Sequence, residues 1–345
     1  MSACIMAFIV ATGVALIVTP AVILLAKRTG AMDKPDKRKV HKVPIPRIGG
    51  LGIYIAFIIS VLTTVIFSIP SAEMQREVIG LIVSGSLMVA LGLIDDYKNL
   101  PAKIKFLGQI LIAMVLVLGF DVRIDFITDP FGDYLYLEWA AIPATIFWLV
   151  GLTNTVNLID GLDGLAAGIA AIAAITILLV ALKQHFFLVA GLTAAIAGAA
   201  SGFLFYNSHP AKIFMGDSGS MFFGFMLAGI SVVGSMKSTA TITLIVPILA
   251  LGVPILDTTF AIVRRFLGGK PIFQPDKGHL HHRLLSLGFT QRQAVFLIYV
   301  VSAILGLSAI ALTEVSSQIA ILILVVVIIS IFYGAKKLGV LRLAN

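Results

Sequence analysis

Four short stretches of this sequence carry residues suited to chemistry, although 59% of the 345 residues are hydrophobic. In chain order they read GLIDDYKNLPAK, NTVNLIDGLDGLAAG, FMGDSGS and GHLHHR. Carboxylates, substrate phosphates and water are the usual ligands of Mg²⁺, and histidine and arginine donate hydrogen bonds to phosphate oxygens. In phosphoryl transfer the protein mostly positions its substrates and neutralises charge. Together, the four stretches favour phosphoryl transfer.

Two adjacent acids, Asp95 and Asp96, follow directly on a long apolar run. At a helix end, such a pair can present one carboxylate to a metal while the other holds a proton or a lysine. The alternative is a pair of solvated loop acids that balance Lys98, Lys103 and Lys105. The apolar run before the pair favours the first interpretation.

Asn157, Asp160 and Asp163 recur at every third residue, so a continuing helix would place them on one face. Gly161 and Gly164 are flexible enough to end that helix and to let backbone amides approach a ligand. The alternative is that Asp160 or Asp163 caps the next helix. Capping explains one of these acids, whereas the whole triplet favours a binding loop.

Asp217 lies in a glycine-rich turn just before a predicted helix. A helix N-terminus favours an acid, so Asp217 either caps that helix or holds a divalent cation. Phe214 lies three residues earlier and either stacks on a ligand or packs in the core, and on its own packing is favoured. The stretch leaves both roles of Asp217 open.

Three histidines and an arginine fall close together as His279, His281, His282 and Arg283. Zinc is disfavoured, because the cluster has no cysteine partner and no H-E-x-x-H helix. Hydrogen bonds to phosphate oxygens fit these residues better, and a surface turn is the alternative. Asp257, in the apolar stretch before them, is expected to make a helix–helix hydrogen bond.

The composition predicts an all-α polytopic membrane protein with a single transmembrane catalytic domain over residues 1–345. Only 12% of the residues are charged and the mean hydropathy is +1.06, whereas soluble domains are roughly 25% charged. Apolar runs of about 17–25 residues cross a bilayer as helices, which satisfy their own backbone hydrogen bonds. About eleven such spans are predicted, over residues 5–26, 49–70, 78–94, 104–120, 139–157, 164–182, 187–206, 220–234, 241–264, 293–312 and 318–335.

Lysine and arginine stay in the cytoplasm when loops are short, and this sets the orientation. All but four of the 25 lysines and arginines fall on one side of the predicted spans; the exceptions are Arg76, Arg123, Lys183 and Lys237. The N-terminus is therefore predicted outside and the C-terminus in the cytoplasm, together with the four stretches named above. The bias also explains the net charge of +8 without nucleic acid as a partner. Residues 121–138 are predicted to form a small hairpin on the outer face.

Taken together, GLIDDYKNLPAKIKFLGQ, NTVNLIDGLDGLAAG, FMGDSGS and PIFQPDKGHLHHRL resemble the polyprenyl-phosphate N-acetylhexosamine-1-phosphate transferases. The similar branch is the bacterial undecaprenyl-phosphate GlcNAc-1-phosphate transferases, which begin teichoic-acid and related surface-polymer synthesis. The resemblance extends from Lys42 to about Arg292. It implies that UDP-GlcNAc and undecaprenyl phosphate give undecaprenyl-pyrophosphoryl-GlcNAc and UMP, with Mg²⁺ as cofactor and Mn²⁺ as a substitute.

The resemblance also implies roles for residues that match the family's motifs. Asp95, Asp96 and His279 are expected to be catalytic, and Asp217 is expected to bind the metal. Asp163 lies toward the uracil and Phe214 stacks on the uridine. The full set of expected substrate-binding residues is Lys42, Arg47, Asn157, Asp160, Asp163, Asn207, Phe214, His281, His282 and Arg283.

Two departures from the family pattern refine this expectation. Asn99 stands where many members carry an aspartate, so a D-D-x-x-D metal motif is not complete and Asn99 is left out of the metal set. VPIPRIGG and HLHH stand where the phospho-MurNAc-pentapeptide transferases have a T-P-T-M-G-G segment and a triple histidine. This difference favours the smaller sugar, and the larger donor is the alternative.

The expected mechanism is direct attack of the lipid phosphate on the β-phosphorus of UDP-GlcNAc, with one of Asp95 and Asp96 taking the proton. A covalent aspartyl-phosphate intermediate is the alternative. The competing class of protein is an ion-coupled transporter, for which only Asp257 lies near the middle of a predicted span. The resemblance further implies a homodimer in the bacterial plasma membrane, with the active site on the cytoplasmic face.

Overall fold

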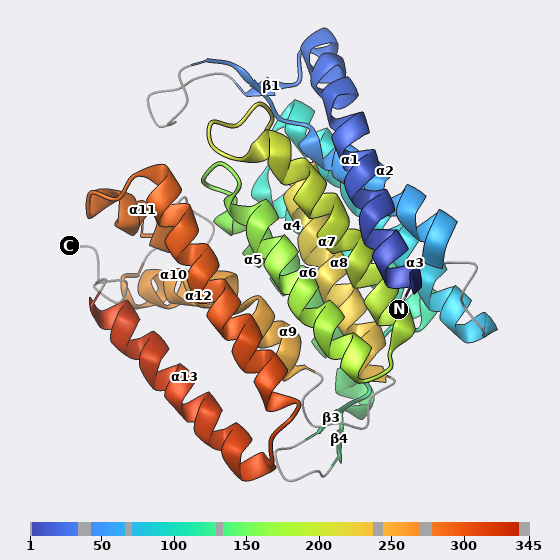
Figure 1. Cartoon of the computed structure of the whole chain (residues 1–345), viewed down its shortest axis with the longest axis vertical. Coiled ribbons are helices and arrows are strands. Elements are labelled where there is room, and N and C mark those ends of the chain that lie inside the picture. The colour runs from blue at the N-terminus through green and yellow to red at the C-terminus, as the bar shows by residue number, and fades with distance from the viewer. Residues whose placement is uncertain are drawn as a thin grey trace.

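The protein is a bundle of long helices with two small two-stranded hairpins (Figure 1). The computed structural model describes residues 2–33, 43–65, 71–128, 134–236, 244–269 and 278–337. Eight of the helices in these residues are long and apolar enough to cross a membrane, which confirms an all-α multi-pass membrane protein. The exact number of spans and their orientation stay predictions.

The helices follow the predicted spans closely. In chain order they are α1 (Ser2–Thr29), α2 (Gly49–Ser60), α3 (Ala72–Lys98), α4 (Ala102–Met114), α5 (Ala141–Ile159), α6 (Leu165–Lys183), α7 (Phe187–Asn207), α8 (Gly216–Met236), α9 (Ile245–Ala250), α10 (Gly252–Leu267), α11 (Leu280–Ser286), α12 (Gln291–Leu312) and α13 (Ser317–Lys337). Short π-helical turns at Val61–Val65 and Val115–Gly119 extend α2 and α4, and a 3₁₀ turn at Glu138–Ala140 precedes α5.

The prediction of one continuous helix over residues 241–264 is wrong. In the described part of this range, α9 ends at Ala250 and α10 begins at Gly252. Pro254 has no N–H to donate to the carbonyl of Ala250, so the ladder of helical hydrogen bonds is interrupted there. The break matters for the site, because it sets the direction in which α10 leaves the bundle.

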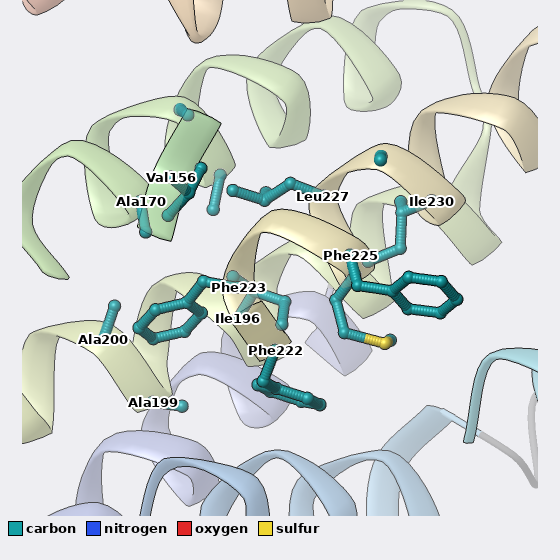
Figure 2. Packing of buried hydrophobic residues seen from close by; sticks show 14 of the residues in the cluster. Val156, Ala170, Ile196, Ala199, Ala200, Phe222, Phe223, Phe225, Leu227 and Ile230 are labelled. Atoms are coloured by element: carbon teal, nitrogen blue, oxygen red, sulfur yellow. The ribbon is translucent and has the colours of Figure 1, made fainter. Parts of the chain in front are cut away.

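Helix α8 lies at the centre of the bundle. Figure 2 shows Phe222, Phe223 and Phe225 of α8 among small side chains of neighbouring helices, such as Ala199 and Ala200 of α7. All three phenylalanines are fully buried. A helix that is buried on every side cannot shift without moving its neighbours, since protein interiors are close-packed. The groups at the start of α8 are therefore held rigidly.

Glycines let α2 and α3 approach the first turn of α8 very closely. A Cβ atom on Gly50 would lie 2.1 Å from the backbone nitrogen of Gly219, and one on Gly92 would lie 2.3 Å from the Cα of Ser218. Small residues at such crossings allow the backbones themselves to touch. Three helices therefore meet beside Asp217.

The predicted hairpin within residues 121–138 is confirmed. Strands β3 (Phe126–Thr128) and β4 (Tyr134–Tyr136) pair antiparallel, with Phe126 opposite Tyr136. A second small pair, β1 (Met32–Asp33) and β2 (Ile45–Pro46), lies beyond the end of α1. The two pairs mark opposite ends of the bundle (Figure 1). The chemical stretches gather at the end that carries β1 and β2.

We expect cysteine labelling to report the orientation of the two ends. Leu135 in β4 and Ser286 in α11 are both exposed, whereas the natural Cys4 is buried. Leu135→Cys should react with a membrane-impermeant maleimide in intact cells, and Ser286→Cys only after the membrane is opened. The parent protein serves as the unlabelled control. The reverse pattern would contradict the predicted orientation.

Candidate active site

The carboxylate of Asp96, at the end of α3, receives the N-terminus of α8. It accepts hydrogen bonds from the backbone N–H of Asp217 (2.9 Å) and of Ser218 (3.2 Å), and from the Ser218 hydroxyl (2.7 Å). The first N–H groups of a helix have no partner within that helix, so Asp96 supplies one from a different helix. This contact fixes the position of Asp217. Asp96 is predicted to be catalytic, and the structure gives it a positioning contact as well.

The turn before α8 is shaped by glycine and by the start of α2. Gly216 has φ +70°, and a Cβ atom there would lie 2.0 Å from the carbonyl oxygen of Arg47 and 2.6 Å from a carboxylate oxygen of Asp96. The N–H of Gly49 donates to the carbonyl of Phe214 at 3.0 Å. The FMGDSGS stretch therefore has glycine at position 216 because no side chain fits.

Lys105, near the start of α4, joins the two acids Asp95 and Asp217. Its ammonium contacts a carboxylate oxygen of Asp217 and lies 3.3 Å from Oδ2 of Asp95. The other oxygen of Asp95 accepts from the backbone N–H of Leu100 at 2.6 Å. Two carboxylates from different helices therefore converge on one cation. The sequence offers Lys105 as one of three lysines that could balance the acid pair, and its contact with Asp217 could not be predicted from spacing.

The second oxygen of Asp217 is held by Asn157, in the last turn of α5. Nδ2 of Asn157 donates to Oδ1 of Asp217 at 3.1 Å and to the hydroxyl of Ser220 at 2.8 Å. The sequence prediction that Asn157 belongs to the site with Asp217 is consistent with this contact. α5 ends at Ile159, so Asp160 and Asp163 do not continue its face but lie in the following turn.

The residues present fit a magnesium ion held mainly by substrate phosphates. The part of the chain that the structure describes contains no group of three or more histidine, cysteine or acidic residues placed to hold a metal by themselves. Mg²⁺ usually takes only one or two protein carboxylates and completes its shell with water and phosphate oxygens. Asp217 and Asp95 already share one cation, Lys105, so this place suits positive charge.

Arg47 lies on the other side of Asp96. One of its guanidinium nitrogens donates to the amide oxygen of Asn99 at 3.1 Å, and another lies 3.6 Å from Oδ1 of Asp96. Asn99 ends α3 in the left-handed conformation, with φ 49°, which asparagine tolerates better than most residues. Asn99 therefore positions Arg47. The predicted Lys42 lies outside the described residues.

Asp163 and Asn207 tie the segment 208–213 to the start of α6. Asp163 accepts from the backbone N–H of Ala211 at 3.1 Å and contacts Nδ1 of His209 at 2.7 Å. The amide of Asn207 accepts from the N–H of Gly164 (3.1 Å) and donates to the carbonyl of Ile213 (2.8 Å). These contacts hold the loop, and the expected substrate contacts of both residues stay predictions.

Asp160 lies in an environment that disfavours negative charge. Burial, followed by repulsion from Asp217, Asp96 and Asp163, raises the pKa of this carboxyl to about 8. A raised pKa of this kind often accompanies a functional site. Asp160 is therefore the acid of the site most easily kept protonated near neutral pH.

The histidine segment, which runs from His279 to Arg283, packs onto the loop that follows α5. The ring of His281 lies so close to Gly161 that a Cβ atom there would be 2.4 Å from Nε2 of His281. The rings of His279 and His281 are stacked, with centroids 5.9 Å apart and planes 8° apart. The ring centroid of His282 lies 4.2 Å from that of His281. Burial lowers the pKa of His281 to about 4, so this ring is neutral. Nε of Arg283 donates to the carbonyl of Gly278 at 3.4 Å.

Asp257 makes the expected hydrogen bond between two helices, α10 and α11. It reaches from α10 to the start of α11, where Oδ2 lies 2.8 Å from Nδ1 of His279 and Oδ1 accepts from the N–H of Leu280 at 2.7 Å. The break between α9 and α10 gives Asp257 this direction. The sequence places Asp257 and His279 in separate stretches, so their pairing could not be predicted from spacing.

Comparison with known proteins places this site in a family. Residues 78–235 match the model of glycosyl transferase family 4. The chain is 41% identical over 339 residues to a probable undecaprenyl-phosphate N-acetylglucosaminyl 1-phosphate transferase of Bacillus subtilis, covering 98% of this chain and 93% of that protein. It is 37% identical to a decaprenyl-phosphate N-acetylglucosaminephosphotransferase of Mycolicibacterium smegmatis, covering 83% and 76%. It is 32% identical to a phospho-N-acetylmuramoyl-pentapeptide-transferase of Listeria monocytogenes, covering 73% and 79%.

These similarities, joined to a helical bundle with charged groups gathered at one end, define a multi-pass bacterial membrane enzyme that transfers a phosphate-linked group. The chain belongs to glycosyl transferase family 4. The resemblance predicted from its four motifs is therefore confirmed.

We expect Gly161→Ala to disable the enzyme without unfolding it. The added methyl group must displace the His281 ring, and a shift of about 1 Å in a catalytic site can lower the rate about 10²-fold. Gly151→Ala is the matched control, because a Cβ atom at that position in α5 meets nothing within 4 Å. Transferase activity of the two purified variants is the measurement. Equal activity would show that the contact of Gly161 with His281 is not needed.

We expect Asp160→Asn to stabilise the protein more at pH 8 than at pH 5. Because the folded-state pKa of Asp160 is raised to about 8, the stability that this group contributes is present at low pH and is lost as the pH rises toward 8. Asparagine removes this loss. The midpoint of thermal unfolding in detergent is the measurement, with Asp121→Asn, an exposed acid, as the control. An equal shift at both pH values would contradict the raised pKa.

Proposed function

We propose that the protein transfers GlcNAc-1-phosphate from UDP-GlcNAc to undecaprenyl phosphate and releases UMP. The observation that carries this proposal is the convergence of Asp95 and Asp217 on Lys105 at the end of membrane-spanning helices. A site there reaches both a lipid phosphate and a soluble nucleotide. The names of the relatives with 41% and 37% identity support GlcNAc as the sugar.

In the proposed reaction, an oxygen of the lipid phosphate attacks the β-phosphorus of UDP-GlcNAc. The new P–O bond forms as the bond to the UMP oxygen breaks, and UMP leaves with the bonding electrons. One of Asp95 and Asp96 takes the proton of the acceptor phosphate. Both oxygens of Asp96 accept hydrogen bonds from α8, and those of Asp95 are held by the N–H of Leu100 and by Lys105. A phosphorylated aspartate is the alternative chemistry.

Charge is neutralised by Lys105, Arg47 and a proposed Mg²⁺. Asp217 would hold the metal, with Mn²⁺ as a substitute. When bound, such a metal offsets negative charge on the diphosphate and the leaving group. Lys105 contacts both acids and so lies where it can exchange a carboxylate for a phosphate oxygen.

The nucleotide and the sugar are proposed to lie over the loop after α5 and the histidine segment. His281 packs on Gly161, so the two segments form one surface. The remaining proposed substrate contacts are those of Lys42, Asn157, Asp160, Asp163, Asn207, Phe214, His282 and Arg283. The phospho-MurNAc-pentapeptide donor is the second candidate, supported by the relative with 32% identity.

The proposed setting is the cytoplasmic face of a bacterial plasma membrane, in teichoic-acid or related surface-polymer synthesis, with the protein as a homodimer. The bias of lysine and arginine toward the side of the membrane that holds the four stretches supports the cytoplasmic face. An ion-coupled transporter is disfavoured, because Asp257 is engaged by His279 and Leu280.

We expect the purified protein to transfer radiolabel from UDP-[¹⁴C]GlcNAc to undecaprenyl phosphate, with activity lost in EDTA and restored by Mg²⁺. Asp217→Asn should abolish transfer, and Asp95→Asn should lower it by about 10²–10⁴-fold, the range of a lost general base. Asp121→Asn, at the opposite end of the bundle, should retain activity. Lipid-linked product formed equally well in EDTA would remove the metal from the proposal, and no product from any UDP-sugar would refute the function.

A further inference from the structure

Asp257 and His279 form a buried pair that the proposed reaction does not yet use. The side chains touch at 2.8 Å between Oδ2 and Nδ1, and both residues are nearly inaccessible, with exposed fractions of 5% and 6%. The second oxygen of Asp257 accepts from the N–H of Leu280, the first residue of α11. A single carboxylate therefore fixes both the ring of His279 and the backbone beside it.

This pairing decides which nitrogen of His279 is available. An ionised carboxylate only accepts hydrogen bonds, so Nδ1 of His279 must carry a proton. Within the described residues, Nε2 of His279 has no hydrogen-bond partner. Nε2 is therefore the atom that can meet a ligand. His281 differs, since its Nδ1 is buried with no hydrogen-bond partner in the described part of the chain and its ring is packed on Gly161.

Helix α10 supports the histidine segment at a second point. A Cβ atom on Gly278 would lie 2.2 Å from a guanidinium nitrogen of Arg264, so this side chain packs directly against the residue before His279. Asp257 and Arg264 both lie on the buried side of α10. The exposed side of the same helix is apolar at Ile262 and Phe266. Two residues of α10, Asp257 and Arg264, therefore hold His279 and the residue before it in place.

We propose that Asp257 is a positioning residue for the transfer reaction. It keeps the proton of His279 on Nδ1 and fixes the plane of the ring, so that the bare Nε2 accepts a hydrogen bond from a hydroxyl or N–H group of the donor sugar. This role rests on the proposed function, because it needs the donor sugar beside His279. A carboxylate that orients an imidazole in this way changes the rate of a reaction more than the binding of its substrate.

Asp257→Asn tests the proposal with little change in shape. The amide oxygen can still accept from Leu280, but the amide NH₂ would donate to Nδ1 and so move the proton of His279 to Nε2. We expect kcat to fall by about 10²–10⁴-fold with the KM for UDP-GlcNAc nearly unchanged. Thr259→Val is the matched control on α10, because within the described residues its hydroxyl bonds only to the carbonyl of Ile255 in its own helix. It should retain the wild-type kcat.

A double-mutant cycle separates positioning from packing. If Asp257 acts through His279, then Asp257→Asn should lower kcat no further in a protein that already carries His279→Ala. Additive losses, or a rise in KM with kcat unchanged, would overturn the proposal. A wild-type protein that transfers nothing would instead refute the proposed function.

A spectroscopic measurement keeps the proposal testable if Asp257→Asn does not fold. The ¹⁵N chemical shifts of His279 in the wild-type protein, assigned by comparison with His279→Gln, report which ring nitrogen carries the proton. We expect the proton on Nδ1. A bare Nδ1 with the proton on Nε2 would overturn the proposal.

Discussion

The carboxylate of Asp96 at the start of α8 is the contact on which the rest of the site depends. The end of a buried helix has backbone N–H groups without partners, and leaving one unsatisfied costs about 1–3 kcal/mol. Asp96 satisfies two of these groups from α3. In doing so it sets the relative position of α3 and α8, and with them the distance between Asp95 and Asp217. The close glycine contacts of α2 and α3 with α8 make this position unique.

The membrane strengthens the need for every polar group of the site to have a partner. Helices that cross a bilayer leave no room for unpaired polar groups, so the charged residues gather where the helices end. There each acid of the site has a specific partner: Asp96 has the start of α8, Asp217 has Lys105 and Asn157, and Asp95 has Lys105. Asp160 is the exception: within the described residues no cation contacts it, and burial, followed by repulsion from Asp217, Asp96 and Asp163, raises its pKa to about 8. The result is a compact site whose charge balance changes readily when a phosphate or a cation enters.

The histidine segment extends the site from a different part of the chain. Asp257 holds it through α10, and Gly161 receives it on the loop after α5. α10 is separated from α9 by a break and packs against α5 and α12. The histidine segment is therefore held to the same bundle that fixes the groups around Asp217.

Motifs and hydrophobic runs predict the helices, the outer hairpin and the family, because these depend on residues close together in the sequence. Contacts between residues far apart in the sequence cannot be predicted in this way. Asp96 meets Ser218, and Lys105 meets Asp217, over more than a hundred residues. The predicted triplet of Asn157, Asp160 and Asp163 divides at the end of α5. The ninth span divides just before Pro254, because a missing backbone N–H outweighs the hydrophobic pattern there.

A cryo-EM structure of the full protein with UDP-GlcNAc and Mg²⁺ in a lipid nanodisc tests the central claim most directly. The account predicts the diphosphate at the start of α8, with an oxygen of Asp217 in the coordination shell of the metal and the ammonium of Lys105 on a phosphate oxygen. A diphosphate bound elsewhere in the bundle, with Lys105 still joined to both Asp95 and Asp217, would contradict it.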